Sequence, residues 1–148
     1  MELEKRFTLN KSERLYHLKA IDALFAGGNP SFPVYPLRAV YRVVPAEELT
    51  PDAPTASILV SEPKKRFKRA VKRNRVKRQV REAYRRQKHL LLDPLAACGL
   101  HVHIAFIWLD PHLHASDEVD LKVRKLLLHI VDKLTAAPAP APGDEPAQ

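Results

Sequence analysis

The sequence contains only one cysteine among its 148 residues, Cys98, and this scarcity excludes two kinds of site. A single thiol cannot form a disulfide within the chain, and it cannot supply the thiol cluster of a structural zinc site. The simplest interpretation is a protein that works in a reducing compartment, so we expect it in the cytoplasm.

Long apolar runs are also absent from the sequence. Residues 1–10 mix charged side chains with isolated apolar ones and contain no apolar stretch of signal-peptide length. No other segment approaches the roughly 18 consecutive apolar residues that a membrane helix needs. We therefore expect a protein that is neither exported nor bound to a membrane.

The usual catalytic motifs are missing as well. The sequence shows no Ser/His/Asp set, no glycine-rich phosphate loop and no paired-carboxylate motif, so an enzyme that acts alone is not expected. His101 and His103, like His112 and His114, alternate as metal ligands on one face of a strand would. Because neither pair has carboxylate or thiol partners at ligand spacing, we predict no metal site.

Acidic residues are almost absent from one segment, Lys64 to Lys88, which holds fourteen basic residues and a single acid, Glu82. The whole chain carries 25 basic and 17 acidic residues, so the sequence outside this segment is net acidic. The positive charge of the protein is therefore concentrated in one patch.

Hydrophobic periodicity predicts the order helix, two or three strands, helix, strand, helix. The strands at Leu37–Val44 and Ala56–Val60 should run antiparallel to each other. Pro33 and Pro36 disfavour an additional edge strand before Leu37. The order indicates an α+β sandwich with helices on one side of a small mixed sheet. The expected elements are a helix that follows the capping box Asn10-Lys11-Ser12-Glu13 and stops at Gly27-Gly28, an edge strand at Phe32–Tyr35, strands at Leu37–Val44, Ala56–Val60 and His101–Leu109, the basic helix, and a last helix opened by Asp117 and Glu118.

The basic segment has the phase of a helix with one buried face. At about 100° per residue, one set of side chains should pack on the sheet and the arginines should lie roughly opposite. The expected core face consists of Val76, Val80, Ala83, Tyr84 and Gln87, and the expected ridge of Arg78, Arg81 and Arg85 with Asn74 and Arg75 on its flanks.

So many like charges on one helix repel one another, and only Glu82 is available within the segment to balance them. A polyanion removes this repulsion, and release of phosphate counterions drives its association, so we predict a nucleic-acid ligand. A basic-zipper protein would need heptad leucines after the basic helix, and a membrane-surface helix would need a wider apolar face. The residues alone leave the choice between RNA and DNA open.

The run from Lys64 to Arg78, followed by Arg81-Glu82-Ala83-Tyr84-Arg85, resembles the signature of the bacterial ribonuclease P protein subunit. Arg73-Asn74-Arg75 is the core of that signature, and the order of elements is similar from about Lys11 to Leu134. The resemblance implies a four-stranded mixed sheet with three helices, like domain 2 of ribosomal protein S5. Its basic helix should cross between parallel strands with left-handed geometry, against the usual rule.

The resemblance also implies a function. The protein should be a subunit of a ribonucleoprotein endoribonuclease that cleaves the 5′ leader from precursor tRNA, with RNA and its bound Mg²⁺ as the catalyst and no catalytic side chain on the protein. The residues expected to bind the ribonuclease P RNA are Lys64, Lys65, Arg66, Lys68, Arg69, Lys72, Arg73, Asn74, Arg75, Lys77, Arg78 and Arg81. Arginine suits this role because its planar fork holds phosphate bidentately and stacks on bases.

In the family a cleft with aromatic faces and cations receives the single-stranded leader. The resemblance places Phe25, Phe32, Tyr35 and Arg38 in that cleft. The sequence departs from the family pattern at three places: Glu62 is an acid where most relatives have none, Ile21 replaces a frequent aromatic, and Arg66-Phe67-Lys68 replaces a glycine-containing stretch. A carboxylate near a phosphate site weakens the contact.

We accordingly expect an N-terminal extension at residues 1–10, one domain at residues 11–134 and a disordered Ala/Pro-rich tail at residues 135–148. The alternative function is an RNA-binding module without a part in cleavage, such as a ribosome-associated protein or an RNA chaperone. Oligomeric state, affinity and the role of the tail do not follow from the sequence.

Overall fold

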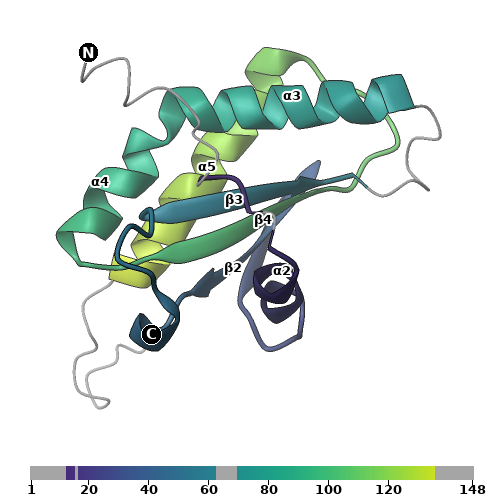
Figure 1. The fold of residues 1–148 in the computed structure, drawn as a ribbon. Helices are drawn as coiled ribbons and strands as arrows, with labels where there is room; N and C mark the ends of the chain where they lie inside the picture. The colour runs from purple at the N-terminus through teal and green to yellow at the C-terminus, as the bar shows by residue number, and fades with distance from the viewer. Residues whose placement is uncertain (1–12, 16, 63–69, 136–148) are drawn as a thin grey trace.

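The computed structural model describes residues 13–15, 17–62 and 70–135 of the chain. Four strands form one sheet in the order β1-β2-β4-β3 (Figure 1). These strands are β1 (Ser31–Val34), β2 (Leu37–Val43), β3 (Ala56–Ser61) and β4 (Val102–Trp108). β2 pairs antiparallel with both β1 and β4, whereas β3 and β4 are parallel, so the predicted mixed four-stranded sheet is confirmed.

Parallel neighbours need a long crossover connection, and two helices provide it between β3 and β4. The first, α3 (Ala70–Gln87), contains the described part of the basic segment except Lys88, which is the N-cap of the second, α4 (His89–Ala97). The remaining helices are α2 (Leu18–Leu24), which precedes β1, and α5 (Ser116–Thr135), which follows β4.

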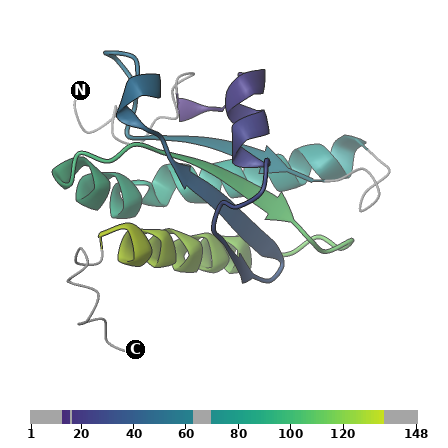
Figure 2. The same cartoon turned by 90° about the horizontal axis from the view of Figure 1, so that it is seen from below.

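The helices cover the two faces of the sheet unequally (Figures 1 and 2). The main core lies between one face of the sheet and α3, α4 and α5, with Phe106 and Trp108 of β4 fully buried in it. Because successive strand residues point to opposite faces, Ala105 faces the other way and packs in a small cluster with Leu15 and with Leu24 of α2. Short α2 leaves part of this second face uncovered.

The last helix follows the predicted pattern closely. Val119, Val123, Leu126, Leu127 and Ile130 of α5 are buried, and Asp117 and Glu118 occupy its first turn, where acids suit the positive end of the helix dipole. No helix in the described part of the chain is long and apolar enough to span a bilayer. The predicted N-terminal extension and disordered tail lie outside the described residues, except that Thr135 ends α5.

The prediction for the first helix is wrong at its start. The helix begins at Leu18 with His17 as its N-cap, and Arg14 instead forms a parallel bridge with Ile58 beside β3. Asn10, Lys11 and Ser12 lie outside the described residues, but Glu13 does not serve a capping box, because its carboxylate pairs with Lys88. The predicted stop at Gly27-Gly28 is confirmed, and both glycines have positive φ.

The helix count also differs from the expected three, because α4 was not predicted. Leu91 and Leu95 lie four residues apart and are fully buried, which gives this short helix its core face. Pro94 lies inside the helix, and a proline in that position usually indicates a break, so the pattern concealed the helix. The α+β class of the fold is nevertheless confirmed.

β2 and β3 run in opposite directions, as predicted, but they are not neighbours, because β4 lies between them. The edge strand that prolines disfavour is present as β1, where Pro33 stands opposite Arg38 of β2. Its position at the edge explains why the sheet tolerates a residue without an amide hydrogen there.

Candidate nucleic-acid interface

The buried face of α3 agrees with the prediction. Val76, Val80, Ala83 and Tyr84 are fully buried, and Gln87 is half-buried. The helix packs on α5 as well as on β3, and the Gln87 amide donates to the carbonyl oxygens of Ala83 and of Asp120 in α5. This packing fixes which side of α3 faces solvent.

The exposed side of α3 begins with its first turn and is cationic. Lys72, Asn74, Arg75 and Arg78 are exposed, and Arg73 and Lys77 are half-buried. Lys72, Arg75 and Arg78 are three residues apart, so each is a neighbour of the next in a row that slants around the helix. We call Lys72, Arg75 and Arg78 the cationic face. The other predicted RNA contacts, Lys64, Lys65, Arg66, Lys68 and Arg69, lie outside the described residues.

The C-terminal half of α3 is balanced by acids, contrary to the predicted arginine ridge. Arg85 donates to both carboxylate oxygens of Glu82, and Arg86 contacts Glu82 and Asp120. The segment therefore has an acidic partner that its own sequence does not contain, since Asp120 comes from α5. The part of the helix left for an anion lies toward its N-terminus.

Arg81, predicted to lie on the ridge, lies on a flank of α3 near the end of β3 instead. It is half-buried, and it lies near Arg14 and Glu62. Burial is the main reason that the pKa of Arg81 is lowered, and the positive charge of Arg14 adds to the effect, while Glu62 opposes it. Arg81 thus connects the cationic face with the face of the sheet that α2 partly covers.

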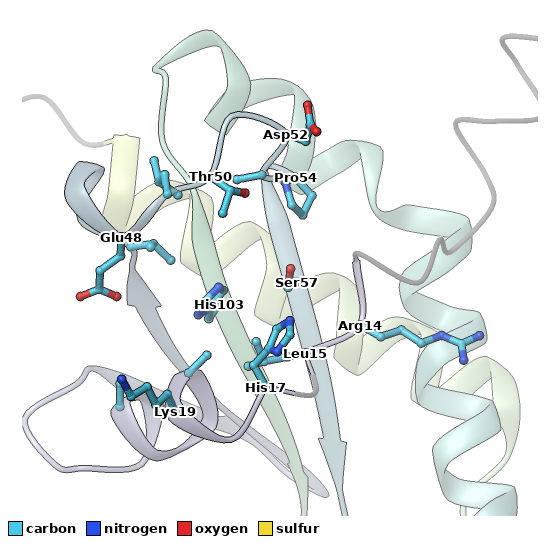
Figure 3. Close-up of a pocket in the computed structure, with 15 residues that line it drawn as sticks. Arg14, Leu15, His17, Lys19, Glu48, Thr50, Asp52, Pro54, Ser57 and His103 are labelled. Carbon is cyan, nitrogen blue, oxygen red and sulfur yellow. The ribbon is translucent and has the colours of Figure 1, made fainter.

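A pocket of about 730 Å³ opens on that second face (Figure 3). Its walls are α2 with the residues before it, the loop from Val44 to Pro54, and the strands β3 and β4. His17, Lys19, Ser57 and His103 contribute polar groups. Arg14 and Lys19 lie on the α2 side of the pocket, whereas Glu48 and Asp52 belong to the loop on the other side, so the α2 side is the part that suits a polar, single-stranded chain.

His103 lies at the floor of the pocket, between β2 and β3. Burial and then the nearby charge of Arg42 lower its pKa, so that the imidazole is neutral at pH 7. Arg42 is itself held by Glu48, whose carboxylate oxygens accept two hydrogen bonds at 2.9 Å and 3.1 Å. A neutral ring beside a neutralised arginine makes this wall of the pocket less cationic than the wall at α2.

The structure does not bring the four predicted leader-binding residues to one place. Arg38 faces the α2 side of the sheet, where it donates to the hydroxyl of Ser31 at 2.9 Å. Phe32 is one strand position away and faces the opposite side, where its ring stacks on His129 of α5 with centroids 3.6 Å apart. The alternation of side chains along a strand thus separates Phe32 from Arg38.

Phe25 and Tyr35 are both exposed, with 45% and 58% of their surfaces accessible. Phe25 is the C-cap of α2, and Tyr35 lies in the turn between β1 and β2. The amide of Asn29 donates to the carbonyl oxygens of Ala23 and Leu24, which fixes the loop after α2 and hence the position of Phe25. Neither aromatic lines the pocket, so their part in leader binding stays a prediction.

The histidine pairs are explained by contacts other than metal binding. His101 Nδ1 lies 2.9 Å from the carbonyl oxygen of Pro54. His114 lies between Asp110 and Glu118, at 2.6 Å and 2.9 Å, so the statement that it has no carboxylate partners is wrong. Within the described ranges, no group of three or more His, Cys, Asp or Glu side chains is arranged to hold a metal ion.

Three polar residues near the interface were missed from the sequence. Arg14 was missed because residues 13–15 were assigned to a helix rather than to a bridge beside β3, and Lys19 was missed because the pocket beside α2 was not predicted. Asp120 was missed because nothing in the periodicity of α5 shows which residue faces α3. The one indication of the position of Asp120 in the sequence is that it follows Val119, which belongs to the buried face of α5.

Comparison with known proteins identifies the family. The family model for ribonuclease P matches residues 9–130. The ribonuclease P protein components of two Porphyromonas gingivalis strains are 45% and 44% identical over 131 residues, which cover 88% of this chain and 92% of each relative. The ribonuclease P protein component of Chlorobium phaeobacteroides is 32% identical over 107 residues, 69% of this chain and 72% of the relative.

Solved structures agree on the fold. The ribonuclease P protein of Staphylococcus aureus superposes with a TM-score of 0.54 at 21% identity, covering 85% of this chain and 97% of the other. The Thermotoga maritima protein gives the same score and identity over 82% and 96%. With a matching family model, close relatives and a cationic helix in the same fold, the chain belongs to the ribonuclease P protein family, RNA-binding components of a tRNA-processing ribonucleoprotein.

Proposed function

We propose that this protein binds the RNA subunit of ribonuclease P through the cationic face of α3. The observation that carries the proposal is the uneven charge of that helix. Lys72, Arg75 and Arg78 are exposed near its N-terminal half, whereas Arg85 and Arg86 are paired with carboxylates. Lys72, Arg75 and Arg78 have no ion pair among the residues that the structure describes. Such cations gain the most from phosphate contact, because they release counterions without first losing a protein partner.

We further propose that the α2 side of the sheet receives the 5′ leader of precursor tRNA. The pocket there has a cationic wall at α2 and neutral His103 at its floor, and Arg38 projects on the same face of the sheet. Arg81 and Arg14 lie between this pocket and the cationic face. The leader would then run from the catalytic RNA across this corner and over the sheet.

In this arrangement the catalyst is the RNA together with the Mg²⁺ ions that it holds, as the family resemblance implies. The protein contributes binding and orientation. Its cations neutralise phosphates that would otherwise repel one another when the catalytic RNA and the leader approach, and this lowers the concentration of magnesium that the complex needs.

Binding measurements can test both parts. The first measures the affinity of the protein for ribonuclease P RNA at several salt concentrations, for wild type and for Arg75→Gln and Arg78→Gln. Each substitution is expected to weaken binding and to flatten the dependence of log K on log salt by about 0.7 to 0.9, the value for one phosphate contact. Arg124→Gln, an exposed position on α5, is the matched control and is expected to leave the slope unchanged.

The second compares precursor tRNA with and without its leader as ligands of the assembled ribonucleoprotein. The leader is expected to raise affinity in wild type, and Arg38→Gln or Lys19→Gln is expected to reduce this advantage without changing affinity for mature tRNA. Equal affinities with and without the leader would contradict the second part and leave the first intact.

A further inference from the structure

Glu62, the residue after β3, is a buried carboxylate at the border of the cationic face. Its side chain is only 6% exposed, and one of its oxygens lies 3.4 Å from the Nζ atom of Lys77. The other oxygen, Oε2, is inaccessible to solvent and has no hydrogen-bond partner among the residues that the structure describes. The charge of this carboxylate is therefore directed at the surrounding cations rather than at water.

Two cations lie near this carboxylate, and a third cation lies near one of them. Lys77 and Arg81 come from α3, and Arg14 comes from the segment that bridges to β3. Figure 3 shows the Arg14 side chain extending toward α3, away from the pocket. Arg14 and Arg81 repel each other, which contributes to the lowered pKa of Arg81 after burial, and Glu62 offsets part of that repulsion.

A cation that already has a carboxylate partner contributes less to binding a polyanion. Lys77 must leave Glu62 to contact a phosphate, and it gains little counterion release when it does so. A phosphate that approaches this corner also meets the negative charge of Glu62. Lys72, one and a half turns earlier on α3, is exposed and has no ion pair within the described residues, so it has neither restriction.

We propose that Glu62 determines specificity: it holds Lys77 out of the set of phosphate contacts, and it thereby weakens binding of RNA that offers only charge. This inference rests on the proposed function, since it assumes RNA as the ligand. Ribonuclease P RNA makes its contacts with cations whose positions are fixed on α3. The affinity of an unstructured RNA instead depends on the number of cations that are available. Glu62 is thus a positioning residue that acts through Lys77.

The first test compares Glu62→Gln with Glu47→Gln, an exposed position between β2 and β3, and the two substitutions change the net charge equally. The probe is a single-stranded oligoadenylate of about 20 nucleotides, and the readout is the slope of log K against log salt. Glu62→Gln is expected to steepen the slope by about 0.7, so that affinity falls about 2.5-fold more than in wild type between 50 and 200 mM salt. Glu47→Gln is expected to change it less, because Glu47 has no ion pair within the described residues and its removal releases no cation.

The second test uses two lysines on the same helix and does not depend on the folding of the Glu62 variant. Lys72→Gln is expected to flatten the slope by about 0.7, the loss of one phosphate contact, and Lys77→Gln by much less. Thermal unfolding of each variant shows whether it is folded. Equal effects of Lys77→Gln and Lys72→Gln, or a slope for Glu62→Gln equal to that of wild type or Glu47→Gln, would overturn the inference.

The same assay with ribonuclease P RNA separates this inference from the proposed function. Glu62→Gln is expected to raise affinity for oligoadenylate more than affinity for ribonuclease P RNA, so the ratio of the two affinities falls. Wild-type protein that fails to bind ribonuclease P RNA would overturn the proposed function and this inference with it. Binding by wild type together with an unchanged ratio for Glu62→Gln would overturn only the role of Glu62.

Discussion

Lys88, at the junction of α3 and α4, donates from its Nζ atom to both carboxylate oxygens of Glu13, at 2.9 Å and 3.0 Å. Both side chains are buried, and the residues are 75 positions apart in the chain. This ion pair attaches the segment before α2 to the end of the cationic helix. It therefore holds together the two surfaces that we assign to RNA.

Removal of one partner should destabilise the fold strongly. Lys88→Met is expected to lower the free energy of unfolding by about 3–5 kcal/mol, because it leaves the Glu13 carboxylate buried without its main counter-charge. Urea denaturation measures this change. The double variant Glu13→Leu/Lys88→Met should recover part of the loss, and a double variant as unstable as the sum of the two single ones would contradict the pairing.

The position of His114 between two carboxylates predicts a dependence of stability on pH. Burial alone lowers the pKa of His114, but its hydrogen bonds to Asp110 and Glu118 outweigh burial and raise the pKa above the ordinary 6.5. The stabilisation is therefore complete below about pH 6.5 and is lost as the pH rises through the folded pKa. Both ring nitrogens face carboxylate oxygens, so only the charged ring can donate to both.

Urea denaturation between pH 5.5 and pH 8.5 measures this effect as the difference between wild type and His114→Gln. The difference is expected to be largest at pH 5.5 and to shrink with rising pH. His103 and His129 have lowered pKa values and act in the opposite direction, but they are present in both proteins and cancel. Glu118→Gln should give an intermediate result, and a difference that is independent of pH would contradict the charged state of His114.

Asp110 makes the stability of the fold depend on pH in the acid range as well. The hydrogen bond from His114 is the main reason that the pKa of Asp110 falls to about 2, although burial opposes it. A lowered carboxylate pKa stabilises the fold above the ordinary value of 3.8 and ceases to do so as the pH falls through about 2. Asp110→Asn should therefore flatten the loss of stability between pH 4 and pH 2, which acid titration followed by circular dichroism measures.

The sequence was sufficient to predict the sheet, the buried faces of α3 and α5, and, through its resemblance to a known family, RNA as the ligand. Apolar residues at helical or alternating spacing, such as Val76 and Val80 or Ile104 and Phe106, determine which side of an element is buried. These patterns are local, and the predicted faces are buried in the folded protein because they pack into one continuous core.

Contacts between distant segments could not be predicted in the same way. Glu13 looked like a capping residue because the motif around it is local, whereas its partner Lys88 is fixed only by the packing of α3. Phe32 was assigned to the leader cleft by resemblance, but its position in β1 turns it toward His129. The capping box is thus wrong and the role of Phe32 in leader binding stays a prediction, and in both cases the position of the side chain depends on contacts with distant segments that periodicity does not show.

The Phe32 stack is expected to affect stability more than RNA binding. Phe32→Leu should lower the free energy of unfolding by about 1 kcal/mol, since it removes an aromatic pair while keeping an apolar side chain. Leader-dependent affinity of the ribonucleoprotein should stay within twofold of wild type. Arg38→Gln, on the opposite face of the sheet, should show the reverse pattern, and a large loss of leader affinity in Phe32→Leu would return Phe32 to the binding site.

Reconstituted cleavage tests the proposed function of this protein most directly. The protein is mixed with the organism's ribonuclease P RNA and precursor tRNA at a low Mg²⁺ concentration, where the RNA alone cleaves slowly, and release of the 5′ leader is measured. We predict that wild type stimulates cleavage and that Arg73→Ala and Arg75→Ala lose much of the stimulation while remaining folded. No stimulation by wild type, or full stimulation by both variants, would contradict the account and favour an RNA-binding module without a part in cleavage.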